Sequence, residues 1–140
     1  MKLSRTVAYA VQATLQLART GSNLPVPCSQ LASDGKMPER FLLQILRNLV
    51  THGILRSTRG VDGGYTLVRP ASEVSLLEVI EAIDGPLNAD SNLGDVLTDN
   101  SHDRLQSALF QVTSTAREQL EAIKLSQLLE APVETPVAAK

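Results

Sequence analysis

Three polar side chains on one predicted helix have the chemistry needed to read the edges of DNA bases. Arg40, Gln44 and Arg47 are spaced four and three residues apart, so they share one face of a helix that begins at Pro38. A guanidinium can donate two hydrogen bonds to guanine, and a carboxamide can pair with adenine. Leu43 can contact the methyl group of a thymine. This pattern predicts base recognition in the major groove, with an ordinary solvated helix face as the alternative.

A glycine-rich turn follows this helix and carries one arginine. Residues 54–57 and 65–69 read as two short strands, and Asp62-Gly63-Gly64 between them supplies the positive φ angles that hairpin turns need. Glycines let such a turn approach the DNA backbone closely, and an arginine at its tip can enter a narrow minor groove. The alternative is a surface hairpin without a ligand. The residues that we expect to contact DNA here are Ser57, Thr58, Arg59 and Gly60.

The beginning of the chain supplies groups suited to phosphate contacts. A helix is predicted to begin near Ser4, its N-cap, and to end before Gly21. Cationic and hydroxyl groups near this end can bind phosphates, which positions a protein on DNA without specifying a sequence. The residues expected in this role are Lys2, Ser4, Arg5 and Tyr9.

The charge of the chain is divided between its two halves. The 140 residues have a formal net charge of −2. Counting Lys and Arg against Asp and Glu gives 9 − 3 = +6 for residues 1–70 and 4 − 12 = −8 for residues 71–140. A basic half is typical of proteins that bind nucleic acids. The alternative is a dipolar protein with solvated charged faces.

The elements that must position these side chains form a mainly α fold with a small β-hairpin wing. A short helix over 29–34, closed by Gly35 in a left-handed conformation, precedes the helix that begins at Pro38. Phe41, Leu42 and the apolar residues after them give that second helix an inward face. Helix, short connection and helix followed by a hairpin is the layout of a winged helix-turn-helix. The predicted organisation is a DNA-binding domain at 1–86, a loop at 87–101, a helical region at 102–130 and a disordered tail at 131–140.

A long helix with one apolar stripe is predicted in the second half of the chain. It runs from about His102 to Ile123, and its apolar residues recur every three or four positions. A helix of this length is too long to be buried wholly on so small a domain, so we expect a second copy of the chain to cover the stripe. The expected dimer-interface residues are Leu105, Leu109, Val112, Ala116, Leu120 and Ile123.

Other classes of function have little support in the sequence. His102 lies near Asp95, Asp99 and Asp103, which could bind a metal, but their irregular spacing favours a solvated acidic loop. Catalytic pairs, phosphate-binding loops and metal-ligand spacing do not occur elsewhere, so we expect neither an enzyme nor a metal site. Cys28 is the single cysteine, and we expect it to be a structural thiol. The sequence shows no apolar run long enough for a transmembrane helix and no signal peptide, which predicts a cytoplasmic protein.

Several short motifs occur in an order that is similar to a known family. They are Met1-Lys-Leu-Ser4, Tyr9-Ala10, Pro38 with Phe41-Leu42 and Ile45-Leu46, Arg59-Gly60 with Gly63-Gly64-Tyr65, and the run from Glu78 to Pro86. In this combination the chain resembles the Rrf-two family of bacterial winged-helix transcription regulators, densely over residues 1–86 and loosely over the long helix. The resemblance implies a homodimer that pairs through the long helix and binds double-stranded DNA at a palindromic operator.

The resemblance also bears on whether the chain binds an iron–sulfur cluster, as some members of the family do. Cluster-binding members of the family carry three cysteines before the long helix, but residues 87–104 contain none, and Ser107 stands where some members have a histidine ligand. Because thiolates hold such clusters, the chain is identified as a member of the cluster-free branch, without a cofactor. A small-molecule or protein effector is the remaining partner, and its identity is open. The alternative function is a winged helix that binds an acidic protein partner.

Overall fold

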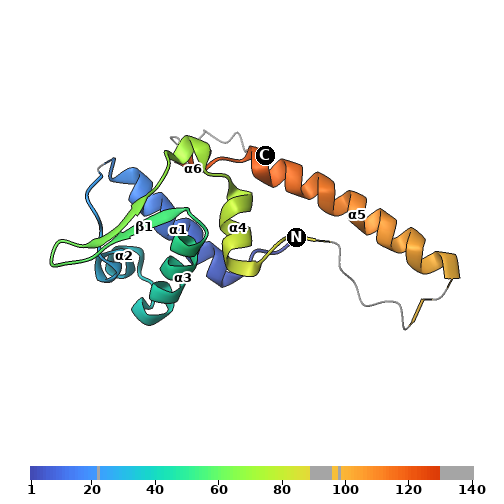
Figure 1. Cartoon of the computed structure of the whole chain (residues 1–140), viewed down its shortest axis with the longest axis horizontal. Coiled ribbons are helices and arrows are strands. Elements are labelled where there is room, and N and C mark those ends of the chain that lie inside the picture. Colours follow the sequence, from blue (N-terminus) through green and yellow to red (C-terminus); the bar gives the residue numbers. More distant parts are fainter. Residues whose placement is uncertain (22, 89–95, 98, 130–140) are drawn as a thin grey trace, which may run out of the picture.

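The computed structural model describes residues 1–21, 23–88, 96–97 and 99–129. Figure 1 shows helices and one hairpin gathered into a body, with one long helix extending away from it. The winged-helix fold predicted from the sequence is confirmed. In chain order the elements are α1 (Arg5–Arg19), α2 (Cys28–Gly35), α3 (Glu39–Thr51), β1 (Leu55–Thr58), β2 (Gly64–Leu67), the 3-10 helix η1 (Ala71–Glu73), α4 (Leu76–Asp84), α5 (Asp99–Ala122) and α6 (Leu125–Leu128).

The core is aliphatic and is built by α1, α3 and α4. On α3 the buried residues recur at helical spacing, and Leu46 and Leu49 have no exposed surface. Val79 of α4 and Leu125 of α6 are equally buried in the same cluster. The core is therefore completed from outside the predicted 1–86 domain, because α6 belongs to the last described part of the chain.

The turn between α2 and α3 differs in detail from the prediction. Lys36, with a φ of 54°, takes the left-handed conformation that we expected at Gly35, which is the last residue of α2. Gly35 is instead surrounded by two side-chain ends. A Cβ atom at Gly35 would lie 2.6 Å from Cε of Met37 and 2.8 Å from Oε1 of Gln16. A larger residue at this position would therefore require the flexible ends of these two side chains to move.

The hairpin wing is joined along one edge to the segment before α2. Its strands are antiparallel, with Leu55 opposite Leu67 and Ser57 opposite Tyr65. On the other side of β2, the backbones of Val26 and Tyr65 exchange two hydrogen bonds, at 3.0 Å and 2.9 Å. Gly64 allows this approach, because a Cβ atom there would lie 2.4 Å from the carbonyl oxygen of Val26. The base of the wing is thus fixed to the helix-turn-helix.

The α4 helix begins with the predicted capping box. The hydroxyl of Ser75 accepts from the Glu78 N–H at 3.1 Å, and the carboxylate of Glu78 accepts from the Ser75 N–H at 3.0 Å. Arg69, just beyond β2, donates to the same carboxylate at 2.5 Å and to the carbonyl of Glu73 at 2.8 Å. One side chain therefore connects the end of the wing to the start of α4.

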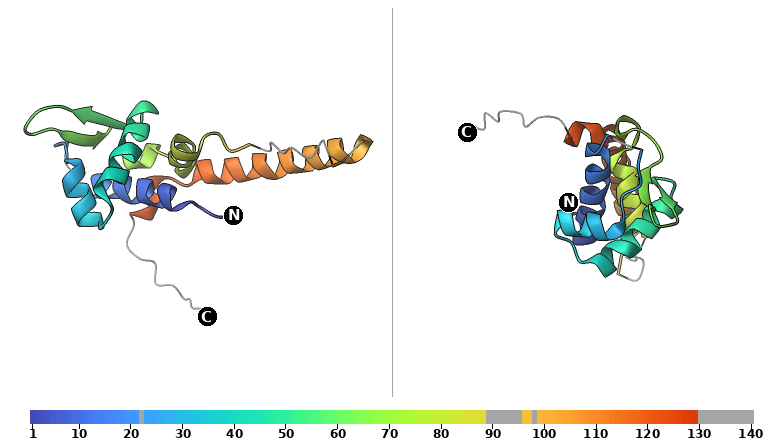
Figure 2. Two further views of the ribbon diagram at one scale, coloured as in Figure 1. Left: turned by 90° about the horizontal axis from the view of Figure 1, so that it is seen from below. Right: turned by 90° about the vertical axis from the view of Figure 1, so that its left-hand side faces the viewer.

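The long helix α5 begins at Asp99, three residues before the predicted start, and ends at Ala122. Figure 2 shows that its first turns lie far from the body and its last turns reach α4. There Arg117 forms an ion pair with Glu81 and donates to the carbonyl of Leu87 at 3.2 Å. Of the predicted loop 87–101, residues 99–101 are helical, and 89–95 and 98 lie outside the described residues. The predicted tail at 131–140 also lies outside them.

After α5 the chain returns to the body and pairs with the segment that precedes α4. The N–H of Leu76 donates to the carbonyl of Ile123 at 2.8 Å, and the N–H of Leu125 donates to Val74 at 2.9 Å. Ser75 and Lys124 form the antiparallel bridge between these two bonds. Within the described part of the chain, no helix is both long enough and apolar enough to cross a membrane.

Candidate nucleic-acid interface

The outward face of α3 carries the three side chains expected to read bases. Arg40, Gln44 and Arg47 are exposed, whereas Leu42 and Ile45 on the opposite face are buried in the core. Leu43 is half-buried at the border of the exposed face. The amphipathic pattern thus places planar hydrogen-bonding groups and one apolar side chain on an accessible helix surface.

A hydrogen bond orients the amide of Gln44 on this surface. Its Nε2 atom donates to Oδ1 of Asn48 at 3.3 Å, across one helical turn. A carboxamide has two N–H donors and one carbonyl acceptor, so Gln44 keeps one donor and its acceptor available. Those two groups are the ones that adenine recognition requires. We did not predict this role for Asn48, although its spacing of four residues from Gln44 is a signal present in the sequence.

The wing places its predicted contact residues in solvent beside α3. Ser57, Thr58, Arg59 and Gly60 are all exposed. The N–H of Gly63 donates to the carbonyl of Gly60 at 3.0 Å, which closes the turn beyond Arg59. Gly60 has a φ of 113°, a conformation that residues with a side chain rarely adopt.

Tyr65 of β2 shows how close α3 and the wing are. Burial raises the pKa of this phenol, the nearby Cys28 raises it further, and the positive charge of Arg47 opposes the rise. Arg47 on α3 therefore acts electrostatically on the base of the wing. The predicted base-reading helix and the predicted minor-groove hairpin belong to one continuous region of the molecule.

The start of α1 fits its predicted role only in part. Lys2 and Arg5 are exposed and available to an anion. The hydroxyl of Ser4 accepts from the Val7 N–H at 3.1 Å as the N-cap, and it lies 3.5 Å from Asp84 as a donor. Ser4 therefore has a structural role of its own.

Tyr9 is half-buried and packs against an exposed phenylalanine of α3. The rings of Tyr9 and Phe41 meet edge to face with their centroids 5.7 Å apart. Phe41 is 43% exposed, so our expectation that it faces inward is wrong. It covers one side of Tyr9 at the junction of α1 and α3, and it adds an apolar group to the edge of the candidate interface.

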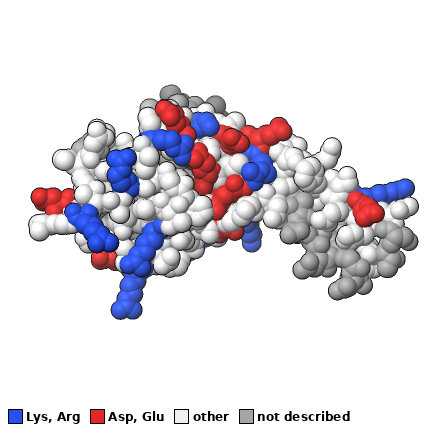
Figure 3. All heavy atoms as spheres, in the orientation of Figure 1, with Lys and Arg blue, Asp and Glu red and all other residues white. Residues whose placement is uncertain are grey.

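The charges follow the division seen in the sequence only in part. Figure 3 shows blue side chains over the wing end of the molecule, with a few red ones beside them, and a mixture of red and blue side chains over the middle. Arg40, Arg47, Arg56 and Arg59 are exposed on α3 and the wing, whereas Lys2 and Arg5 are exposed at the start of α1, which packs with α4 and the last turns of α5.

The predicted dimer stripe on α5 is divided between two environments. Val112 is 66% exposed, and Leu105, Leu109, Ala116 and Ile123 are half-buried. Leu120 is only 8% exposed and packs against α1 and α4 of its own chain, in a cluster with Val7, Leu77 and Ile80. Phe110, which we did not include, is 66% exposed on another side of the helix.

The residues of the chain do not fit an iron–sulfur cluster. Cys28 is the only cysteine, and its thiol donates to the carbonyl of Glu39 at 3.7 Å. Burial raises the pKa of this thiol, and the nearby Glu39 carboxylate raises it further, which favours the protonated form over a thiolate ligand. In the described ranges, no three His, Cys, Asp or Glu side chains gather where they could hold a metal ion.

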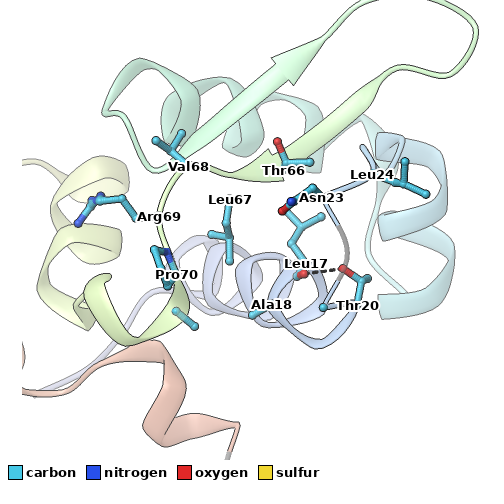
Figure 4. Close-up of a pocket in the computed structure, with 12 residues that line it drawn as sticks. Leu17, Ala18, Thr20, Asn23, Leu24, Thr66, Leu67, Val68, Arg69 and Pro70 are labelled. Carbon is cyan, nitrogen blue, oxygen red and sulfur yellow. Dashed lines mark hydrogen bonds between the residues drawn. The ribbon is translucent and has the colours of Figure 1, made fainter.

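A cavity of about 360 Å³ lies on the outer side of the wing base (Figure 4). Leu17 and Ala18 of α1 form one wall and Leu67 of β2 another, while Asn23 and Thr66 contribute polar groups at its mouth. No pattern of residues in the sequence predicted this cavity. Its other lining residues are Thr20, Gly21, Leu24, Val68, Arg69, Pro70 and Ala71.

Comparisons with known proteins agree with this geometry. The chain is 44% identical to an HTH-type transcriptional regulator of Mycobacterium tuberculosis over 98 residues, which are 69% of this chain and 61% of that relative. It is 34% identical to the HTH-type transcriptional regulator IscR of Klebsiella pneumoniae over 89 residues, 64% of this chain and 55% of the relative. The chain thus spans less than two thirds of the length of the curated relatives that it matches.

Solved structures share the fold over most of the chain. The global cysteine regulator CymR of B. subtilis matches with a TM-score of 0.74 at 23% identity, covering 91% of this chain and 95% of CymR. IscR of T. potens matches with a TM-score of 0.71 at 27% identity, covering 92% of this chain and 86% of IscR. The family model described as an iron-dependent transcriptional regulator, Rrf2, matches residues 3–131. The chain therefore belongs to the Rrf2 family of transcriptional regulators.

Proposed function

We propose that this protein is a transcription regulator that binds a palindromic DNA operator as a homodimer, without an iron–sulfur cluster. The observation that carries the proposal is the exposed face of α3 next to the wing. It combines three side chains able to read bases with a glycine-rich turn that presents Arg59. Groups of these types at this spacing suit simultaneous contact with a major groove and the neighbouring minor groove.

In this proposal α3 enters the major groove. Arg40 and Arg47 bind guanines, Gln44 binds adenine with its remaining donor and acceptor, and Leu43 contacts a thymine methyl. Arg59 reaches into the adjacent minor groove, where the wing meets the backbone through Ser57, Thr58 and Gly60. Lys2, Arg5 and Tyr9 hold phosphates beside α1, and Ser4 supports them by capping the helix.

The homodimer in this proposal pairs through the part of α5 that extends from the body. The 24 residues of α5 correspond to a helix about 36 Å long. Its last turns pack on α4, whereas Phe110 and Val112 are each 66% exposed in the single chain. A second α5 would cover the apolar stripe that includes Val112, and two-fold symmetry would place two copies of α3 on two half-sites.

The cluster-free state rests on the single thiol of the chain. One half-buried cysteine, whose thiol donates a hydrogen bond to a backbone carbonyl, cannot replace the several thiolates that hold a cluster. We therefore expect regulation through a small-molecule or protein effector. Protein purified without oxygen is expected to lack the visible absorbance of a cluster, and its presence would contradict this part of the proposal.

The main test compares two arginines at opposite ends of the molecule. Arg59→Ala is expected to weaken binding to the selected operator at least about tenfold, because it removes the minor-groove contact of the wing. Arg104→Ala removes the same charge from the exposed start of α5 and is the matched control. Binding is measured by fluorescence anisotropy on sites enriched from random DNA. Equal affinities of the two variants for DNA would show that the wing does not contact DNA. Binding to an acidic protein in place of DNA would favour the alternative function.

The second test separates base reading from phosphate contact. Gln44→Ala is expected to lose about 1–3 kcal/mol for one base pair in each half-site and much less elsewhere. Gln119→Ala, at an exposed position of α5, is the control. Parallel selection of binding sites with both variants measures the preference at each position. A uniform loss over all sequences would show that Gln44 does not face base edges.

A further inference from the structure

The pairing between β2 and the segment that precedes α2 ends after one pair of residues. Tyr65 and Val26 exchange two backbone hydrogen bonds on the side of β2 opposite to β1. Val68 directs its N–H toward Ile54 at the start of β1, at 3.1 Å. Because backbone groups alternate along a strand, the N–H and carbonyl of Leu67 point to the same side as those of Tyr65. Among the residues that the structure describes, none forms a hydrogen bond with these two groups.

The cavity at the wing base lies on this side of Leu67. The register that pairs Val26 with Tyr65 would set Leu24 opposite Leu67, and both of these residues instead line the space of about 360 Å³. Figure 4 shows the side chain of Leu67 directed toward α1, whose apolar residues form the opposite wall. The cavity therefore combines a backbone donor and acceptor with apolar walls. Sites for small molecules have this composition and volumes of about 300–1,000 Å³.

The walls of the cavity offer no charge to a ligand. Arg69 is the single ionisable side chain among the described residues that line it. Its guanidinium donates to the carboxylate of Glu78 at 2.5 Å and to the carbonyl of Glu73 at 2.8 Å, and Figure 4 shows it directed away from the cavity, toward α4. Asn23 contributes a neutral carboxamide at the mouth. Because an unpaired charge is costly to bury, this site favours a neutral ligand.

We propose that this cavity binds a small, neutral, N-acylated amino-acid derivative whose carboxyl group is blocked as an amide or ester. A ligand that pairs with Leu67 as Val26 pairs with Tyr65 must present an N–H and a carbonyl on either side of one carbon atom. An acylated amino acid has this arrangement, and blocking its carboxyl removes the negative charge. Residues opposite each other in an antiparallel pair have side chains on the same face, so the ligand's apolar substituent enters the space beside Leu17 and Ala18.

A ligand in this position would act on the wing. It would contact Leu24 in the segment before α2 and Leu67 in β2, and so would extend the pairing at the base of the wing by one residue. This consequence rests on the proposed DNA-binding function. A ligand that holds the wing against the helix-turn-helix should raise the affinity for the operator, and the operator should raise the affinity for the ligand by the same factor.

The first test is an NMR titration of the full chain without DNA, with N-acetyl-L-leucine methylamide as the probe. We expect the backbone amide of Leu67 and the side-chain amide of Asn23 to shift with a Kd of about 1 mM or lower, the scale for about a dozen non-hydrogen atoms. The control probe carries a methyl group on the acetylated nitrogen and lacks the N–H that would bond to the carbonyl of Leu67. It should bind about two- to tenfold more weakly, the range for loss of one net hydrogen bond.

A pair of variants tests whether the probe occupies the cavity. Ala18→Leu extends a larger side chain into the space and should weaken binding at least about tenfold. Ala8→Leu makes the same change at an exposed position of α1 outside the cavity and should bind the probe as the wild type does. Signals of core amides that match the wild type show that both variants are folded. A wild type that shows no shift at Leu67, equal binding of the two probes, or full binding by Ala18→Leu would overturn the proposal.

The second test measures operator affinity with and without saturating probe. We expect binding at least about fivefold tighter with the probe in the wild type, at the lower end of the usual range of allosteric coupling, and no change in Ala18→Leu. An unchanged affinity in the wild type would overturn the action on the wing. Because the titration contains no DNA, it still decides whether the ligand site exists if the chain fails to bind any operator, a result that would contradict the proposed function instead.

Discussion

The carboxylate of Glu78 joins the end of the wing to the start of α4. One of its oxygens accepts from Arg69 at 2.5 Å and the other from the Ser75 N–H at 3.0 Å. Burial alone would raise the pKa of this carboxyl, but the hydrogen bonds from Arg69 and Ser75 outweigh it and hold the pKa below its usual value. A carboxyl whose pKa is lowered by folding stabilises the folded state only while it is ionised.

Glu78→Gln is therefore expected to destabilise the protein in a pH-dependent way. At pH 7 the free energy of unfolding should fall by about 0.5–1 kcal/mol, the scale of a partly exposed ion pair. This difference is fully present above the ordinary carboxyl pKa of 4.5 and shrinks as the pH falls through the lowered pKa of Glu78, because the wild-type carboxyl then becomes protonated. Urea unfolding at pH 7 and about pH 3 measures it, with Glu118→Gln as an exposed control. The same difference at both pH values would contradict this role.

At the scale of single residues, the sequence predicts which face of a helix a side chain lies on better than it predicts which other side chains surround it. The exposed positions of Arg40, Gln44 and Arg47 follow from the apolar period of α3, which is independent of tertiary contacts. Phe41 breaks the same rule. It lies at the border of the buried face, and its exposure depends on the position of the Tyr9 ring. The spacing of apolar residues along α3 gives no information about that position.

At the scale of elements, the helix ends depend on contacts that are distant in the chain. Gly35 looked like the left-handed residue after α2 because glycine tolerates that conformation best. In the structure Lys36 takes it, and Gly35 stays in the helix, with the side-chain ends of Gln16 and Met37 close to it. The choice between the two positions could not be made without knowing how α1 packs against α2.

The division of the α5 stripe changes which substitution tests the dimer. Val112→Asp places a charge on a side chain that is 66% exposed in the single chain, so the protomer should stay folded while the proposed pairing is lost. Light scattering coupled to size exclusion at micromolar concentration is expected to show a dimer for the wild type and a monomer for this variant. A variant that still dimerises would place the interface elsewhere.

Leu120→Asp serves as the contrasting substitution. Leu120 is 8% exposed and packs on Val7 and Leu77, so replacing it should destabilise the protomer by at least about 2–5 kcal/mol. The stripe alone predicted a shared role for both positions. The spacing of apolar residues defines one face of α5, but it does not show which turns of the helix pack on α1 and α4 of the same chain and which turns extend away from them.

At the scale of the whole molecule, the charge is arranged along the long axis. On the face shown in Figure 3, blue side chains predominate at the end that carries the wing, and most red side chains lie in the middle of the molecule, among other blue ones. This arrangement brings one end toward a polyanion and keeps the other end away from it. The sequence predicts this distribution only in part, because the start of α1 packs with α4 and α5 and so brings basic and acidic segments together.

The salt dependence of DNA binding should report this arrangement. If each protomer neutralises about five phosphates, a dimer releases counterions from about ten, and log K should fall against log salt concentration with a slope near −9. Titrations on the operator between about 50 and 200 mM salt measure this slope. Arg56→Ala, at an exposed cation of β1, should reduce its magnitude by about two if that side chain contacts a phosphate, because the dimer then loses one contact in each protomer. A slope shallower than about −2 for the wild type would contradict the proposed interface.

The way in which residues 120–129 complete the core has a consequence for synthesis on the ribosome. Leu125 is fully buried, and the bonds of Ile123 and Leu125 to Leu76 and Val74 hold the beginning of α4. A nascent chain that has emerged only as far as residue 86 lacks these partners, although its helix-turn-helix and wing are already present. The winged helix should therefore reach its full stability only after the returning segment has left the exit tunnel. Until then the side chains of Val7, Val74 and Leu77 are incompletely covered.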